Sequence, residues 1–270
     1  MKKQFKAITT IILLLINLQS SFAQFSAEQQ KLIEQLKSIV ADKSSHDTTV
    51  ADAYVHLSEL VGVSDKDSMY VLCIKAQQLA EQALAKKPSK AITLSLKITL
   101  STALNNIGYY FKEQGDIAQG VEFYKKSISL LEEIDFQQGL GSAYNNIGLV
   151  HYNQGNIPLA LEYFHKSIKI REEVDDKKGL ASVYNNLGSL YKHQKNIPLA
   201  VDYFDKCLAI CEEIGDKKGM AYSYNNIGTL HFLLDNVPLS LEYYQKSLAL
   251  REVMGDKRGM AENLHNMAKA

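Results

Sequence analysis

A forty-residue internal repeat is the feature of this sequence that most limits how the chain can fold. Residues 141–180 and 181–220 are identical at 21 of 40 positions, and residues 181–220 and 221–260 at 19 of 40. Tandem units of 20–50 residues are typical of stacked architectures, in which each unit buries its apolar face against its neighbours. We therefore expect the chain to be built by stacking and not around one central core.

The pattern within each unit predicts two helices. Apolar residues recur at helical spacing over 140–154, and a break follows. Asn156 can cap a second helix, Pro158 suits its opening turn, and Gly179 is a plausible C-terminal cap. The predicted pairs span 101–134, 141–174, 181–214 and 221–254. The Asp-Lys-Lys-Gly segments at 176–179 and 216–219 are expected to be soluble loops between units.

Small residues recur where the two helices of a unit should touch. In the first helices they are Gly108, Gly148, Gly188 and Gly228, and in the second helices Gly120, Ala160, Ala200 and Ser240. Helices that approach closer than the usual ~8–10 Å need small side chains at the contact. We therefore expect a close contact at these positions, with a bulky aromatic residue beside it.

These residues carry a resemblance to the tetratricopeptide repeat, whose order is large apolar, Leu-Gly, aromatic, Ala, aromatic and small. The third unit supplies Tyr184, Leu187-Gly188, Tyr191, Ala200, Phe204 and Cys207 in that order. His151 and His231 replace the usual aromatic residue, and the final proline is missing from every unit. Because the unit exceeds the family's ~34 residues, it resembles the repeats of kinesin light chain and of Pins-type adaptors. The resemblance implies an all-α fold, a right-handed α-solenoid of tetratricopeptide helix-turn-helix repeats with the first helices on its concave wall.

The remaining segments flank four forty-residue units at 101–260. Residues 24–100 are expected to form an N-terminal helical cap with degenerate repeats, and residues 261–270 begin a partial fifth unit. Within the cap, the pattern predicts helices over 26–42, 49–61 and 65–87. Ser89 is placed to cap the long helix that leads into the first unit.

Residues 1–23 have the organisation of a secretory signal peptide. Three lysines precede an uncharged apolar run, and Ser21-Phe22-Ala23 fits a cleavage site before Gln24. A membrane anchor is the alternative, but twelve helical residues rise only ~18 Å against a hydrocarbon core of ~30 Å. We therefore expect an exported chain, periplasmic or secreted after cleavage, with no stable membrane span in the mature protein.

Composition and motifs exclude several classes of function. Thirty Lys+Arg balance thirty Asp+Glu, so the cationic surplus of a nucleic-acid-binding protein is absent. The sequence contains no phosphate-binding loop, no Gly-x-Ser-x-Gly elbow and no His-Glu-x-x-His motif. We expect no enzymatic activity, no cofactor and no metal. The three cysteines, Cys73, Cys207 and Cys211, are expected to be packing residues and not a disulfide framework.

Packing alone explains the repeated Asn pair poorly. The pair lies on the first helix, and an Asn side chain can bracket a peptide amide with its donors and acceptor. Two alternatives stay open: the second Asn ties neighbouring helices together, and the first faces solvent. The candidate groove residues are Asn105, Asn106, Tyr109, Asn145, Asn146, Tyr152, Asn185, Asn186, Ser189, Lys192, His193, Asn225, Asn226 and Phe232, with Lys112 and Asn153 in addition.

The leading functional hypothesis is a non-catalytic scaffold that holds a protein or peptide ligand in the concave groove. The alternative is the extracytoplasmic sensor portion, truncated in this chain, of a histidine kinase or a transcriptional regulator. In similar exported repeat proteins the array is often followed by a membrane helix and a signalling domain. The sequence names neither the partner nor the oligomeric state.

Overall fold

The computed structural model describes residues 26–42, 44–62 and 64–270. The predicted signal peptide lies outside these residues. Within them no helix is long and apolar enough to cross a membrane.

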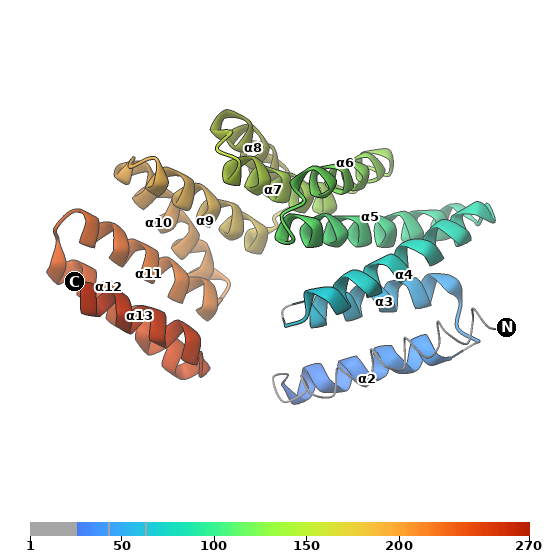
Figure 1. Ribbon diagram of the computed structural model, residues 1–270, viewed down its shortest axis with the longest axis horizontal. Helices are drawn as coiled ribbons and strands as arrows, with labels where there is room; N and C mark the ends of the chain where they lie inside the picture. The colour runs from blue at the N-terminus through green and yellow to red at the C-terminus, as the bar shows by residue number, and fades with distance from the viewer. Residues whose placement is uncertain (1–25, 43, 63) are drawn as a thin grey trace. The chain divides into compact units, whose positions relative to one another are not determined.

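Twelve helices and no strand make up the described residues (Figure 1). They are α2 (Ala27–Ala41), α3 (Asp47–Val61), α4 (Lys66–Ala85), α5 (Lys90–Glu113), α6 (Ile117–Glu133), α7 (Gln137–Asn153), α8 (Ile157–Glu173), α9 (Lys177–His193), α10 (Ile197–Glu213), α11 (Lys217–Leu233), α12 (Val237–Met254) and α13 (Lys257–Lys269). The predicted helical pairs are confirmed, as are the three helices of residues 24–100. Ser89 caps α5 as expected, since its hydroxyl accepts a hydrogen bond from the Ile92 amide at 3.5 Å.

The chain divides into two compact parts, which we call unit 1 (Met1–Gly139) and unit 2 (Leu140–Ala270) and which are distinct from the forty-residue repeats. In unit 1, α3 packs against α4 and α5, and α5 packs against α6. Its core includes the fully buried Leu57, Cys73 and Ile107. In unit 2, each helix from α8 to α13 packs against the next along the chain, and Phe164, Leu187 and Leu190 are fully buried.

The two helices of each hairpin meet at the predicted small residues. A Cβ atom placed on Gly148 would lie 2.9 Å from the Phe164 ring and 3.4 Å from the Ala160 carbonyl oxygen. Further along the same pair, the Ser167 hydroxyl of α8 donates to the Gly141 carbonyl of α7 at 2.6 Å. The same bond joins Ser127 to Ser101 and Ser247 to Ala221, so close packing and one buried hydrogen bond fix the second helix on the first in three of the four repeats, whereas the third has Cys207 at that position.

The expectation of a soluble loop at 176–179 is wrong. Asp176 is the N-cap of α9, and its carboxylate accepts a hydrogen bond from the Gly179 amide at 2.9 Å, so Lys177 already begins the helix. Asp216 caps α11 in the same way. Gly179 is accordingly not the C-terminal cap of α8, which ends at Glu173 with Val174 as its C-cap. Aspartate is a strong N-cap residue, and its preference decides the boundary here.

Asn156 and Pro158 behave as predicted. The Asn156 side chain accepts a hydrogen bond from the Leu159 amide at 3.4 Å, and Pro158 lies in the first turn of α8. The turn before this cap needs a left-handed residue, which is Gly155 with φ of 75°. At the same repeat position Lys195 adopts φ of 59°, a conformation that costs a non-glycine residue ~1–2 kcal/mol.

The two substituted histidines pack as aromatic residues. His151 stacks on Tyr163 with ring centroids 5.6 Å apart, and His231 stacks on Tyr243 at 5.5 Å. In the third unit, Tyr191 and Tyr203 make the same contact at 5.5 Å. The packing interpretation of these histidines is confirmed.

Candidate functional site

The Asn pairs of unit 2 form a ladder between consecutive first helices. The Asn186 amide donates to the Asn145 side-chain oxygen at 2.8 Å, joining α9 to α7. The same bond joins Asn226 to Asn185 at 3.2 Å and Asn266 to Asn225 at 3.1 Å. The second Asn of one forty-residue repeat therefore hydrogen-bonds the first Asn of the preceding repeat, as the helix-tie alternative predicts.

Burial strengthens this conclusion for the first Asn of a pair. Asn145 and Asn225 are only 7% and 6% exposed, so they do not face solvent as one alternative proposed. A side-chain amide buried this deeply needs its hydrogen bonds made within the protein. Ligand contact by the Asn pairs stays a prediction. The bonds between repeats already use several of their donors and acceptors, which leaves fewer of these groups for a ligand. The pairs concerned are Asn145 and Asn146, Asn185 and Asn186, and Asn225 and Asn226.

The candidates in unit 1 lie on α5 and have different neighbours. The Asn105 amide is 3.5 Å from the Asn106 side-chain oxygen, and Asn106 lies beside the Cys73 thiol. The Tyr109 ring is flanked by two ammonium groups, with Lys112 Nζ 4.7 Å from its centroid and Lys66 Nζ 5.4 Å from it. Glu113 forms ion pairs with both lysines, so their charges on this aromatic surface are partly neutralised.

Four candidates in unit 2 lie on α7 and α9. Tyr152 hydrogen-bonds the His193 ring through its hydroxyl, which also lies 3.3 Å from the Ser189 carbonyl oxygen. The Tyr152 and His193 rings stack with centroids 5.6 Å apart. Lys192 lies one residue before His193 and is half-buried. We call Tyr152, Ser189, Lys192 and His193 the α7–α9 cluster.

Burial changes the ionisation of two groups in this cluster. It lowers the pKa of the Lys192 ammonium from its ordinary value, and the attraction of Glu262 on α13 opposes the shift. Burial also raises the pKa of the Tyr152 phenol, which therefore stays protonated at neutral pH. The cluster thus contains a partly desolvated ammonium, a phenol and an imidazole.

Phe232 continues this surface on α11, and Asn153 lies at the end of α7. Tyr152, Lys192 and Phe232 occupy the same position of three successive units, so they follow one another along α7, α9 and α11. Phe232 is half-buried and Asn153 is exposed. This face therefore changes from phenol to ammonium to phenyl along unit 2.

The described residues hold no group of three or more His, Cys, Asp or Glu side chains that could bind a metal. Their three cysteines are buried free thiols. Burial raises the pKa of Cys73 to about 11 and that of Cys211 to about 12, so both thiols are protonated and unreactive at neutral pH.

Sequence reasoning missed two buried arginines. Arg171 and Arg251 share one repeat position and are 6% and 1% exposed. A buried guanidinium needs a counter-ion, and Asp176 supplies it for Arg171. An invariant glycine at the end of each unit, such as Gly179, was the available signal, because only glycine leaves room for this guanidinium.

Stacked helix hairpins joined by short capped turns define a helical-repeat protein. Two family models described as "Tetratricopeptide repeat" match the sequence, one at residues 99–173 and 139–213 and the other at 220–257. Together they cover more than half of the chain, which belongs to the tetratricopeptide repeat family. Repeats of this family generally act as non-enzymatic scaffolds that bind other proteins, and no catalytic family is indicated.

Solved structures share this fold at low sequence identity. BtubC (BKLC) from P. vanneervenii matches with a TM-score of 0.63 and 16% identity over 85% of this chain and 90% of that protein. Aspartyl phosphate phosphatase F from Bacillus subtilis matches with a TM-score of 0.60 and 14% identity, over 90% of this chain and 68% of the other. No curated protein matches the sequence significantly.

A sensor protein also shares the fold. The chain matches, with a TM-score of 0.58 and 14% identity, a Signal Transduction ATPase with Numerous Domains from Pyrococcus horikoshii that has a tetratricopeptide repeat sensor. The match covers 90% of this chain and 43% of that protein. At this identity the likeness extends to the fold alone.

Proposed function

We propose that this chain is a non-catalytic scaffold that binds a protein or peptide through the first-helix side of unit 2, centred on the α7–α9 cluster. The observation that carries the proposal is the contact between Tyr152 and His193, which joins two consecutive repeats, with the half-buried Lys192 next to His193 in the sequence. Repeat proteins use surfaces formed by successive units to bind extended partners.

The charges of the cluster favour a partner with an acidic group. The Lys192 ammonium is partly desolvated, and no ion pair shorter than 4.0 Å is found for it within the described residues. A carboxylate that reached it would gain a charge-assisted hydrogen bond in a low-dielectric setting. Tyr152 and His193 offer an aromatic surface on which the neighbouring part of an acidic peptide can lie.

A photo-crosslinking experiment tests this assignment. A benzoylphenylalanine residue at His193, which is exposed on α9, should capture the partner in cells, whereas the same residue at Asp202, exposed on α10, should not. With the captured partner in hand, Lys192→Met should weaken binding about tenfold, as expected for one charged hydrogen bond. Lys206→Met is the matched control, because Lys206 pairs with Asp202 on the second helix. Equal capture at both sites, or an unchanged Kd for Lys192→Met, would place the interface elsewhere.

The sensor role is the second candidate. The Pyrococcus horikoshii protein, whose repeat sensor shares this fold, supports it. We further propose that the scaffold acts outside the cytoplasm, which rests on the predicted signal peptide. Sequencing the coding DNA beyond codon 270 decides between the candidates, because a transmembrane segment and a signalling domain there would favour the sensor.

A further inference from the structure

Each buried arginine of unit 2 fills a prepared site between the end of one repeat and the start of the next. Arg171 Nε donates to the Ser167 hydroxyl at 3.1 Å, and its Nη2 donates to the Ser142 hydroxyl at 3.1 Å. Its Nη1 pairs with the Asp176 carboxylate. A Cβ atom on Gly179 would collide with this guanidinium, so the glycine leaves the space that the arginine occupies.

Arg251 occupies the same position in the fourth repeat but has different partners. Its guanidinium donates to the Gly259 carbonyl, lies 3.3 Å from a Glu262 carboxylate oxygen, and faces the Tyr222 ring at 5.2 Å from the centroid. A Cβ atom on Gly259 would again collide with the arginine. The site is therefore a repeated feature of the fold, occupied by an arginine in the second and fourth units.

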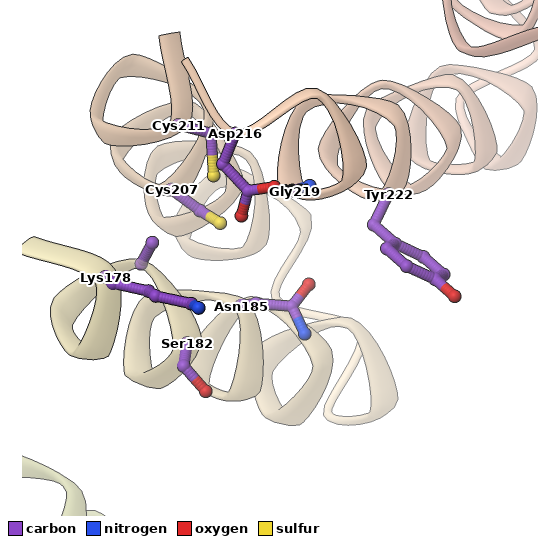
Figure 2. A pocket seen from close by; sticks show the side chains of 9 residues that line it. Lys178, Ser182, Asn185, Cys207, Cys211, Asp216, Gly219 and Tyr222 are labelled. Carbon is purple, nitrogen blue, oxygen red and sulfur yellow. Dashed lines mark hydrogen bonds between the residues drawn. The ribbon is translucent and has the colours of Figure 1, made fainter. Parts of the chain in front are cut away.

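The third unit keeps the site but lacks the arginine, because Cys211 stands at that position. Of the residues around Arg171, Ser142, Asp176 and Gly179 have identical counterparts in Ser182, Asp216 and Gly219, whereas Ala181 replaces Gly141 and Cys207 replaces Ser167. These counterparts line a pocket of about 220 Å³ that is partly open to solvent (Figure 2). This is many times the ~10–15 Å³ that one water molecule needs.

Figure 2 shows how polar groups surround this pocket. The thiols of Cys207 and Cys211 and the Asp216 carboxylate lie on one side, and α9 presents Ser182 and Asn185 on the other. We call this the third-unit pocket. The pocket keeps the carboxylate and one of the two serine hydroxyls that the Arg171 guanidinium contacts, and Cys207 replaces the other hydroxyl.

The Asp216 carboxylate keeps its capping bonds but has lost its cation. One of its oxygens accepts hydrogen bonds from the Lys218 amide at 3.1 Å and the Gly219 amide at 3.0 Å. No ion pair involving Asp216 occurs among the described residues, whereas the equivalent Asp176 pairs with Arg171. The second carboxylate oxygen is thus available to a cationic donor.

The other charged residue of the pocket is Lys178, and the fold shows that a guanidinium can coexist with it. Lys218 occupies the same repeat position in the next unit, where Arg251 is bound. Burial raises the pKa of both Cys207 and Cys211, so the two thiols are neutral and neither repel nor coordinate a cation. The Tyr222 ring at the pocket can face a second guanidinium as it faces Arg251.

We propose that the third-unit pocket binds an alkylguanidinium group supplied by another molecule, in the place that Arg171 and Arg251 fill in their own units. The group would pair with Asp216 and donate to Ser182 while its aliphatic stem lies against Ala181 and the two cysteines. The donor is an arginine side chain of a polypeptide or free arginine. If the donor is a polypeptide, the pocket adds an arginine contact to the proposed scaffold. Only this polypeptide case rests on the proposed function.

A titration of the full chain with N-acetyl-L-arginine amide tests the proposal. The amide NMR signals of Lys218 and Gly219 report on Asp216 and should shift in a saturable way. The citrulline analogue, which has nearly the same shape without charge, should bind at least tenfold more weakly. Tighter binding of free L-arginine would identify a small-molecule donor, and tighter binding of N-acetyl-L-arginine amide would identify a polypeptide.

Variants then locate the site. Asp216→Asn should weaken binding about ten- to a hundredfold, and Cys211→Arg should abolish it by filling the pocket and should raise the Tm. Lys206→Ala, on the outer side of α10, should leave binding unchanged. Arg171→Cys should create a second site beside Asp176 and raise the stoichiometry from one to two.

The proposal is overturned if the arginine probe and its citrulline analogue bind alike, if the probe does not bind, or if Asp216→Asn keeps full affinity. The last variant decides the matter even if Cys211→Arg fails to fold. If the arginine probe does not bind, crosslinking at His193 can still succeed, and if crosslinking fails, the titration can still succeed. The two proposals therefore fail separately.

Discussion

Replacing Asn186 with alanine should show that the Asn ladder stabilises the stack of repeats. The variant removes the 2.8 Å hydrogen bond to Asn145, which contributes ~1 kcal/mol. It also leaves the Asn145 oxygen, in a side chain only 7% exposed, without that donor, at a further cost of ~1 kcal/mol. Alanine returns up to ~0.7 kcal/mol of helix propensity. The free energy of unfolding should therefore fall by about 1–2 kcal/mol.

The neighbouring bonds provide the comparison. Asn266→Ala should cost about as much, because its acceptor Asn225 is 6% exposed. Asn226→Ala should cost less than about 1 kcal/mol, since its acceptor Asn185 is more exposed and can bind water instead.

Urea denaturation of the full chain measures these differences, with an unchanged m-value as the check that the transition itself is unaltered. A double-mutant cycle of Asn145→Ala and Asn186→Ala should give a coupling of about 0.5–1.5 kcal/mol. Affinity for a partner should be kept in the folded fraction. Unchanged stability together with weaker binding would refute the tie and restore these side chains as ligand contacts.

Three further predictions can be tested. Gly148→Leu should cost about 1–3 kcal/mol, because even a Cβ atom would lie 2.9 Å from the Phe164 ring, whereas Asn153→Leu on the exposed end of α7 should stay within ~0.5 kcal/mol in the same urea assay. Lys195→Gly should raise the free energy of unfolding by up to ~1 kcal/mol, and with it the urea midpoint, because glycine relieves the strain of a left-handed φ of 59°. A lower midpoint would contradict the strain argument. Mass spectrometry of the chain from a cell envelope fraction should find Gln24 at the N-terminus, and a retained Met1 would instead indicate an anchor.

Local chemistry made most of the fold predictable. The spacing of Gly148 and Ala160, the Asn156 cap and the Pro158 turn each act within one hairpin, so the sequence contains the whole interaction. The boundary at Asp176 was missed because Asp-Lys-Lys-Gly suits both a polar loop and a helix N-terminus. The deciding contact, the Asp176 carboxylate on the Gly179 amide, depends on where the preceding helix ends.

The site was less predictable because it depends on contacts between units. Helical spacing placed Tyr152, Lys192 and His193 on one face, and two of them do meet. It could not show that Asn145 is buried, because that burial arises from α9 packing beside α7. The Arg171 position was missed for the same reason: a charged residue late in a helix is usually solvated, and only the stack reveals the glycine and aspartate that enclose it.

The comparison between units separates structural positions from binding positions. The Asn pair recurs in every unit from the first to the fourth, and the hydrogen bond it makes in unit 2 is a contact that each stacked repeat requires. A role that all units share is a role in stacking. Positions that change from unit to unit while the backbone around them stays the same have no such constraint. They include the tyrosine, lysine and phenylalanine of the first-helix face and the arginine that becomes Cys211. Because these positions are not held by stacking, they are where we expect recognition of a particular ligand to lie.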